Sequence, residues 1–190
     1  MNTIVRFFSK SYIFLCTTIV FIIFLIVVLP GQSEKAALYT PEAGSFDTSF
    51  FYAPQVVYDT IAAYGETGRA AYIYDRWTFD LIFPFVYGLF ILSAIAFSVF
   101  RIGWVFFRSS RWIIVPIAAM VLDLLENTFL SLAMGLYPSE YSILAVCASA
   151  ATVLKWLFVT TAMGLAFLFP LLLVVNKLTD RRKRNTGAVE

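Results

Sequence analysis

Long apolar runs alternate with short polar stretches along the chain. Three runs, at residues 12–29, 77–100 and 112–136, are each close to the length of about 20 residues with which a helix crosses a bilayer. A fourth run, 142–175, is too long for one perpendicular crossing and too short for two crossings joined by a turn. We therefore expect four membrane spans, the last of them a single helix that is tilted or projects from the membrane.

The first run also has a second interpretation, as a cleaved signal peptide. Its apolar core is longer than the roughly 7–15 residues of a signal peptide, which favours an uncleaved anchor. Pro30 is expected to end this span. A polar segment, 31–76, follows, and its first part, 32–50, is expected to be irregular because Pro41 and Gly44 interrupt helices.

The rest of this polar segment has helical features. Apolar residues recur with helical spacing over 53–64, which predicts a short helix along the membrane surface, and Gly65 suits its carboxyl end. Gly68 predicts a second turn. A second helix is then expected to begin near Arg69 and to run without a break into the span at 77–100.

The composition places these helices in a membrane. Of the 190 residues, 61% are hydrophobic and only 14% are charged, whereas a water-soluble domain carries about 25% charged residues. We therefore predict an all-α polytopic membrane protein, with four transmembrane helices packed as a bundle. It forms a single membrane domain over residues 1–190, with a partly helical outer segment between spans one and two.

Basic residues gather at those ends of the spans that share one side of the membrane. They are Arg6 and Lys10 before the first span, Arg101, Arg108 and Arg111 between the second and third, and Lys177, Arg181, Arg182, Lys183 and Arg184 after the fourth. The segment 31–76 carries three basic residues against six acids. The positive-inside rule therefore predicts cytoplasmic termini and an external segment 31–76, with the plasma membrane as the expected location.

The basic tail, 177–190, has two interpretations. It resembles a nucleic-acid-binding patch in charge, but its position directly after a span fits a stop signal beside anionic lipid. Membrane lipid is therefore an expected partner, and nucleic acid is not.

Several chemistries lack their usual residues. The chain contains no histidine, which removes the commonest metal ligand and the commonest general base. Cys16 lies within the first run and Cys147 near the start of the last, so no disulfide is predicted. No nucleophile elbow, P-loop or metal-ligand spacing occurs in the sequence. We expect no metal and no cofactor.

Three polar residues stand inside the third run, where hydrocarbon is expected. Asp123, Glu126 and Asn127 are spaced i, i+3 and i+4, so they share one helical face. A rise of about 1.5 Å per residue across a core of about 30 Å places them between the middle of the membrane and its outer third. A charged side chain facing lipid costs about 3 kcal/mol, so this face is expected to point into the bundle.

Polar residues of the other spans fall at similar depths. Tyr87 lies at about the depth of Glu126, and Asp80 shares its face nearer the outer boundary. Arg76 precedes Asp80 by four residues, which predicts an ion pair. Lys155 shares its helical face with small residues, along which membrane helices pack closely, so it is expected to point inward. These small residues are Ala148, Ala151, Ala162 and Ala166.

These polar residues form the candidate site. Glu126 and Asp123 are the candidates for acid–base catalysis or for anchoring a ligand, since a buried carboxyl beside a tyrosine and a lysine can transfer protons. Either Lys155 or Arg76 compensates these acids, or one of the two carboxyls carries a proton. The candidate ligand-binding residues are Asn127, Tyr87, Lys155, Arg76 and Asp80.

Three functions are compatible with such a cluster. The leading one is a structural network that holds the last three spans together. The second is a site that binds a lipid, an isoprenoid-like molecule or another small apolar ligand, or acts on it by acid–base chemistry. The third is a proton- or ion-coupled carrier, which would have to be a homo-oligomer because four spans are few for a carrier.

The external segment contains many aromatic residues, and these also have two interpretations. They form either an aromatic belt at the lipid headgroups or a cap over a lipid-binding cavity. The residues are Tyr39, Tyr52, Tyr58, Tyr64, Tyr72, Tyr74 and Trp77.

The layout as a whole resembles the emopamil-binding and sigma-2-receptor group, in having four spans, cytoplasmic termini and acids within the membrane. This resemblance implies a sterol-like ligand for the buried acids. It is architectural and carries no residue motif, so it supplies no site residues.

Overall fold

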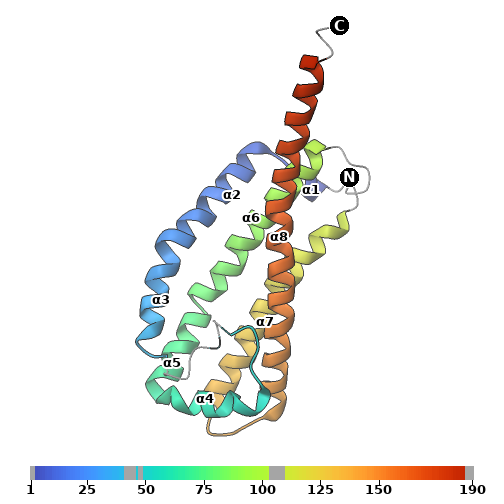
Figure 1. Cartoon of the computed structure of the whole chain (residues 1–190). Coiled ribbons are helices and arrows are strands. Elements are labelled where there is room, and N and C mark those ends of the chain that lie inside the picture. Colours follow the sequence, from blue (N-terminus) through green and yellow to red (C-terminus); the bar gives the residue numbers. More distant parts are fainter. Residues whose placement is uncertain (1–2, 41–45, 47–48, 103–109, 187–190) are drawn as a thin grey trace.

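The four expected spans are present in the computed structural model, which is an all-α helical bundle (Figure 1). The structure describes residues 3–40, 46, 49–102 and 110–186, and no strand occurs among them. Four helical segments of this part of the chain are long and apolar enough to cross a membrane, which confirms the predicted fold class. In chain order these spans are Ser11–Ala37, Gly65–Ile102, Ile114–Leu136 and Ser142–Thr179.

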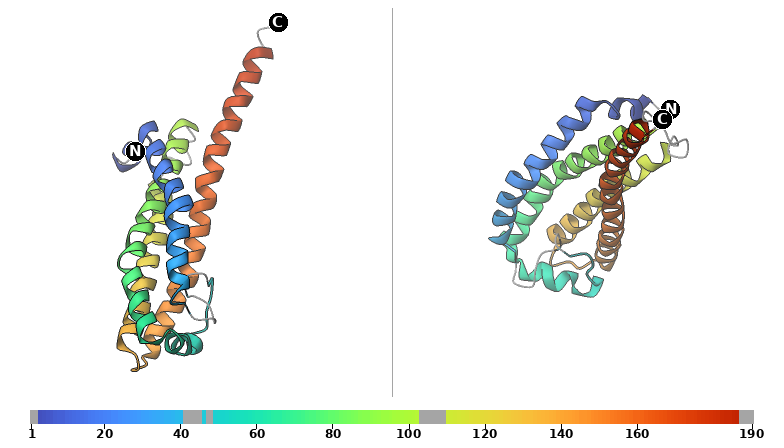
Figure 2. Two further views of the ribbon diagram at one scale, coloured as in Figure 1. Left: turned by 90° about the vertical axis from the view of Figure 1, so that its left-hand side faces the viewer. Right: turned by 45° about the horizontal axis from the view of Figure 1, so that its top comes forward.

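The two ends of the bundle differ in what they contain (Figures 1 and 2). Helix α1 (Thr3–Phe8) and the last turns of α8 (Ser142–Thr186) lie at one end, called here the terminal end. Helices α4 (Val57–Ala63) and α5 (Gly65–Arg76) lie at the other end, called the α4 end. Because the number of spans is even, α1 and the last turns of α8 lie at the same end of the bundle.

The first span continues beyond Pro30, so the predicted end at this residue was wrong. The span consists of α2 (Ser11–Ile23), a π-helical segment η1 (Phe24–Val28) and α3 (Leu29–Ala37). Proline has no backbone N–H, and its ring clashes with the carbonyl four residues earlier. The wider turns of η1 lie directly before this position, and they carry the chain past the proline without ending the helix.

The stretch predicted to be irregular is partly helical. Residues 32–37 belong to α3. The predicted helix breakers Pro41 and Gly44 lie outside the described residues. Further on, the short helix predicted over 53–64 is confirmed, and it consists of the 3₁₀ turn η3 (Pro54–Val56) and α4.

The junction between α4 and α5 depends on two glycines. Gly65 has a φ of +64°, a left-handed conformation that favours glycine, so the predicted helix end is confirmed. Helix α5 starts there rather than near Arg69, and Gly68 lies inside it, so the predicted turn at Gly68 was wrong. A Cβ atom at Gly68 would lie 3.1 Å from the carbonyl oxygen of Tyr39, so this glycine allows the incoming chain to pack closely.

The remaining spans follow the predicted boundaries with one difference. A turn at Trp77 separates α5 from α6 (Phe79–Ile102), whereas an unbroken helix was expected. The 3₁₀ turn η5 (Ser110–Ile113) and α7 (Ile114–Leu136) form the third span. Helix α8 is a single helix that contains Pro170 and projects beyond the other helices at the terminal end, as predicted (Figures 1 and 2).

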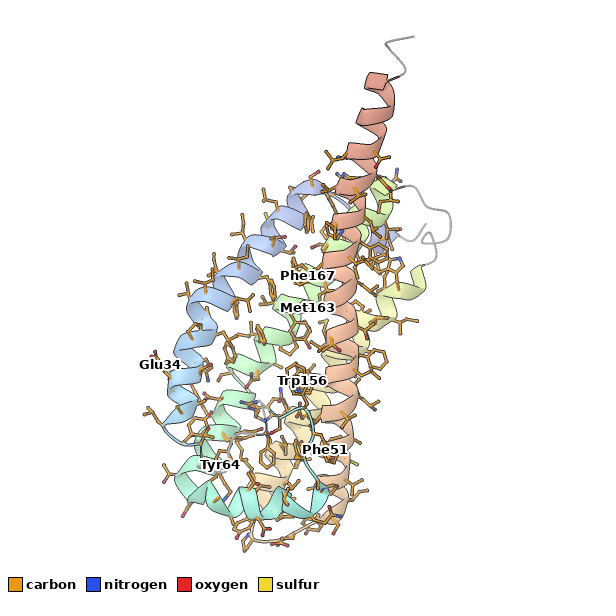
Figure 3. All side chains as sticks on the ribbon, viewed as in Figure 1. Glu34, Phe51, Tyr64, Trp156, Met163 and Phe167 are labelled. Carbon is orange, nitrogen blue, oxygen red and sulfur yellow. The ribbon has the colours of Figure 1, made fainter. Side chains whose placement is uncertain are left out.

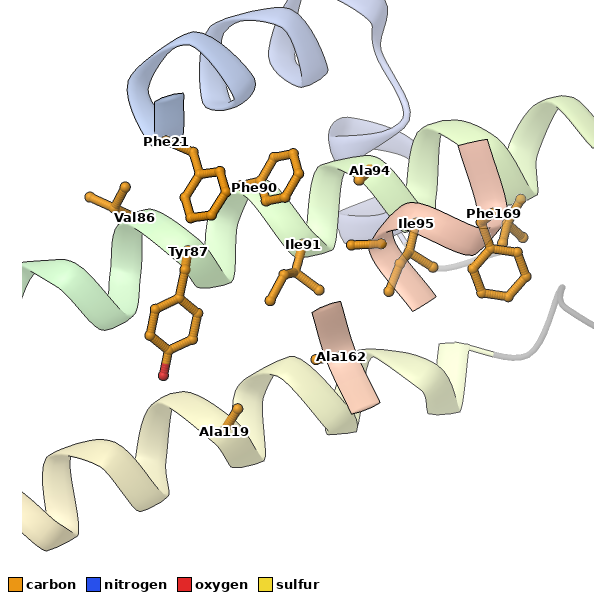
Figure 4. Packing of buried hydrophobic residues seen from close by; sticks show 12 residues of the cluster. Phe21, Val86, Tyr87, Phe90, Ile91, Ala94, Ile95, Ala119, Ala162 and Phe169 are labelled. Atoms are coloured by element: carbon orange, nitrogen blue, oxygen red, sulfur yellow. The ribbon is translucent and has the colours of Figure 1, made fainter. Parts of the chain in front are cut away.

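Helix α6 connects the first span to the rest of the bundle. It packs against α7 and α8, which also pack against each other, and α2 packs along its other side (Figure 2). The rings of Phe21 and Phe90 stack with centroids 4.4 Å apart and planes 4° apart (Figure 4). The hydroxyl oxygens of Thr17 and Ser93 lie 2.5 Å apart in the same interface. Apolar packing and hydrogen bonds therefore fix the first span on α6.

The aromatic residues of the segment between spans one and two are divided between two environments. Tyr74 and Trp77 are exposed, as expected for an aromatic belt. Four other tyrosines fill a second core at the α4 end, so the belt interpretation was wrong for them: Tyr52, Tyr58, Tyr64 and Tyr72. The Tyr58 hydroxyl accepts a bond of 2.7 Å from the N–H of Tyr141, so the phenol ties α4 to the start of α8. These tyrosines are buried because α4 and α5 fold across the end of the bundle and enclose their rings, which is a feature of the tertiary structure.

We expect Phe90→Leu to lower the melting temperature in detergent, because it removes the ring that stacks on Phe21. The loss should be about 1 kcal/mol, the value typical of an aromatic pair. The matched control is Phe85→Leu on the same helix, because Phe85 is 46% exposed. Equal melting temperatures for the two variants would contradict this view of the α2–α6 interface.

Candidate functional site

Four of the predicted site residues meet in one cluster between α6, α7 and α8. The Lys155 ammonium lies 3.5 Å from Asp123 Oδ1 and also forms an ion pair with Glu126 Oε2. The Tyr87 hydroxyl donates a hydrogen bond of 3.0 Å to Asp123 Oδ2. Figure 4 shows the Tyr87 ring pointing away from Phe21 and toward α7. Lys155 is therefore the cation that compensates the acids of α7.

Arg76 compensates a different acid. Its Nη2 lies 2.7 Å from Asp80 Oδ2, so the predicted ion pair is present, and both side chains are largely buried. Its guanidinium also lies 4.4 Å from the centroid of the Tyr72 ring, in a cation–π contact. The Asn127 amide donates a bond of 3.3 Å to the backbone carbonyl of Asp80. Asn127 thus holds the first turn of α6 against α7.

Two further residues complete the cluster, and neither is among the site residues predicted from the sequence. Thr152 Oγ donates a hydrogen bond of 2.5 Å to Glu126 Oε1, and the Tyr52 hydroxyl lies 2.8 Å from the same Oγ. Thr152 could have been found, because it shares the helical face of Ala148 and Lys155. Tyr52 could not, because it comes from the irregular chain before η3.

The irregular segment 49–53, which precedes η3, forms two more hydrogen bonds with α8. Ser149 Oγ donates a bond of 2.6 Å to the carbonyl of Tyr52. About two turns further along α8, the Trp156 indole donates a bond of 3.1 Å to the carbonyl of Ser49. Since this chain follows α3, these bonds join the end of the first span to the fourth span.

Helix α8 turns its small residues toward the bundle, as predicted. Lys155 is buried on the same face, which brings its ammonium to the acids of α7. The small residues on this face are all buried: Ala148, Ala151, Ala162 and Ala166. Close approach of α8 to α7 therefore supports the ion pairs of the cluster.

The described ion pairs near the cluster are not one to one. They join three carboxylates, on Asp80, Asp123 and Glu126, to two cations, on Arg76 and Lys155. The Glu126 side chain is only 2% exposed, so its charge depends on its hydrogen-bond and ion-pair partners. The Tyr87–Asp123 hydrogen bond beside an ammonium provides groups that can exchange a proton or hold a polar ligand.

A cavity of ≈ 780 Å³ adjoins the cluster. It lies between the first span and α8, and α6 lines it as well. Trp156 and Met163 lie on the side of α8 that faces the first span (Figure 3). The charged side chains on its wall are Arg76, Asp80, Asp123 and Lys155, beside the phenol of Tyr87. The apolar part of the wall includes Phe21, Leu25, Phe83, Val159 and Met163.

The cavity divides the predicted site residues into two groups. Five of the seven lie on its wall, and they are Arg76, Asp80, Tyr87, Asp123 and Lys155. Glu126 and Asn127 are buried between helices instead. Within the described part of the chain, no three His, Cys, Asp or Glu residues are placed to hold a metal ion.

No protein family matches the chain, and neither a curated protein nor a solved structure is detectably similar to it. The geometry of the cavity and the cluster is therefore the basis for a functional proposal.

Lys155→Met should destabilise the protein by about 3–5 kcal/mol, because it leaves the carboxylates of Asp123 and Glu126 buried without their cation. Chemical denaturation in detergent measures this loss. Adding Glu126→Gln to Lys155→Met should restore part of the stability, since it removes one of the unpaired charges. Lys177→Met, at an exposed position of the same helix, is the control. Additive losses in the double variant would contradict the coupling.

Proposed function

We propose that the protein binds an amphipathic, lipid-like molecule in the cavity. The observation that carries this proposal is a cavity of ≈ 780 Å³ whose wall combines apolar side chains of three spans with paired charges. Inside a membrane, charged groups on a cavity wall are costly unless a polar group or water faces them. A ligand with one polar end and one apolar end fits both parts of this wall.

The order of the residues along the helices gives the ligand a direction. Gln32 and Arg76 line the cavity near the α4 end, and Phe21, Leu25 and Met163 line it toward the terminal end. The polar end of the ligand would lie toward the α4 end, and its apolar part would lie along α2 and α8. Because the first span and α8 form facing walls, the ligand would enter from the lipid between them.

The distribution of charge adds an orientation to this proposal. Basic residues next to the terminal end would lie in the cytoplasm under the positive-inside rule. The α4 end would then face the outside, and the ligand would come from the outer leaflet of the plasma membrane.

We assign a structural role to Glu126 and Asn127, and a specific observation favours it. Both are buried away from the cavity wall, at 2% and 3% exposure. Glu126 bonds to Thr152 and Lys155 of α8, and Asn127 bonds to the start of α6. These residues would join the last three spans, whatever occupies the cavity.

Val159→Trp should fill the apolar part of the cavity and remove the bound ligand. Native mass spectrometry and lipid analysis of the gently purified protein would measure this, with the wild-type chain expected to carry a reproducible small molecule. Leu157→Trp is the matched control, because Leu157 on the same helix is 59% exposed. A bound molecule retained by Val159→Trp, or an empty wild-type protein, would overturn the proposed function.

Glu126→Gln distinguishes a structural role of Glu126 from a role in ligand binding. Losing one charge-assisted hydrogen-bond partner should destabilise the protein by about 2 kcal/mol, which a lower melting temperature in detergent would report. Ligand occupancy, measured well below that temperature, should match the wild-type value. Unchanged stability together with a lost ligand would show that Glu126 belongs to the binding site instead.

A further inference from the structure

Gln32 lines the cavity, and its hydrogen bonding is incomplete within the described part of the chain. It lies in α3, on the wall formed by the first span. Its Nε2 atom is buried, and no acceptor lies within hydrogen-bond distance among the described residues. A buried donor without an acceptor costs about 1–3 kcal/mol, so such a group on the wall of a cavity marks the place of an acceptor that the protein does not provide.

The other uncharged donors on the wall already have acceptors. Three hydroxyls bond to carbonyl oxygens of their own helical turns, the Trp156 indole bonds to the Ser49 carbonyl, and the Tyr87 phenol bonds to Asp123. The three hydroxyls belong to Ser33, Thr40 and Thr160. The Gln32 amide is therefore distinguished from these donors by its missing acceptor.

The charges on the wall select against an anionic ligand. Arg76 is paired with Asp80, and Lys155 is paired with both Asp123 and Glu126. On the wall itself, two carboxylates, of Asp80 and Asp123, balance two cations, of Arg76 and Lys155, so an anionic ligand would bring an uncompensated charge into a medium that screens it poorly. A protonated amine would also add an uncompensated charge, and it offers no acceptor to the Gln32 N–H groups.

We propose that the ligand is an uncharged lipid whose polar end carries a hydrogen-bond acceptor, such as an ester or ketone oxygen, and that Gln32 donates to this oxygen. The inference rests on the proposed function, because it assumes that the cavity binds a lipid. It adds the chemical class of the polar end and the residue that recognises it. The first span thereby supplies specificity, and the second and fourth spans supply most of the remaining wall.

Three amphiphiles with the same chain length and different polar ends test this assignment. Methyl palmitate is uncharged and only accepts hydrogen bonds, cetylamine is a cationic donor at neutral pH, and cetyl sulfate is an anion at every accessible pH. Binding of each to the full-length wild-type protein in a non-ionic detergent would be measured by native mass spectrometry over a range of concentrations. We expect methyl palmitate to bind best, with cetyl sulfate at least about tenfold weaker because its charge stays uncompensated.

Variants of Gln32 then test the donor itself. Gln32→Leu should weaken methyl palmitate binding by about three- to tenfold, the loss typical of one neutral hydrogen bond. Gln32→Glu has nearly the same shape but replaces the amide donor with an acceptor, so it should weaken methyl palmitate and strengthen cetylamine. Glu34→Gln is the control, because the Glu34 side chain is exposed and points away from the bundle (Figure 3). It should leave all three affinities unchanged.

The outcomes distinguish this inference from the function on which it rests. If Val159→Trp abolishes methyl palmitate binding but both Gln32 variants bind it like the wild type, the cavity is the site and the Gln32 assignment is wrong. Wild-type preference for cetylamine or cetyl sulfate would also overturn the assignment. If Val159→Trp leaves methyl palmitate bound, the proposed function itself fails.

Discussion

The ion pairs that Lys155 of α8 makes with Asp123 and Glu126 of α7 are the interaction on which the rest of the bundle depends. A carboxylate inside the membrane is costly unless a cation and hydrogen-bond donors face it. Thr152 and Tyr87 supply such donors, so the cluster fixes α6, α7 and α8 relative to one another. The small residues of α8 allow the close approach that these bonds require.

The first span is held by different forces, and the cavity exists because of this difference. It packs along α6 through stacked rings and the Thr17–Ser93 contact. The chain after α3 also connects it to the bundle, because this chain bonds to α8 through the carbonyls of Ser49 and Tyr52. The space between α2 and α8 thus has two walls. Hydrogen bonds connect these walls at the α4 end, and apolar packing on α6 holds α2 in place along its length. A lipid-binding function would use this space, with charges at its wall and hydrocarbon along it.

The same cluster would serve both stability and binding, with its residues divided between the two. Glu126 and Asn127 connect helices from buried positions, whereas Asp123, Tyr87 and Lys155 have one side toward neighbouring helices and another toward the cavity. Lys155 links the two groups because it pairs with both acids. Charge neutralisation of the interior and the polarity of the cavity wall are therefore consequences of one arrangement. This is why a structural network and a binding site are not exclusive interpretations of the polar residues.

The sequence by itself determined the helices and the inward faces of their polar residues, because apolar length and helical spacing are local properties. It predicted four spans, the Arg76–Asp80 pair and the inward direction of Lys155. The tertiary structure decided the features that the spacing of residues within one helix cannot specify. The first span passes Pro30 because a π-helical segment precedes it, and the tyrosines of the α4 end are buried because α4 and α5 fold across the bundle. Tyr52 reaches Thr152 across 100 positions of the chain, and Gln32 lines the same cavity as Arg76 and Lys155. Such contacts depend on how whole helices pack, and no periodicity within one helix specifies them.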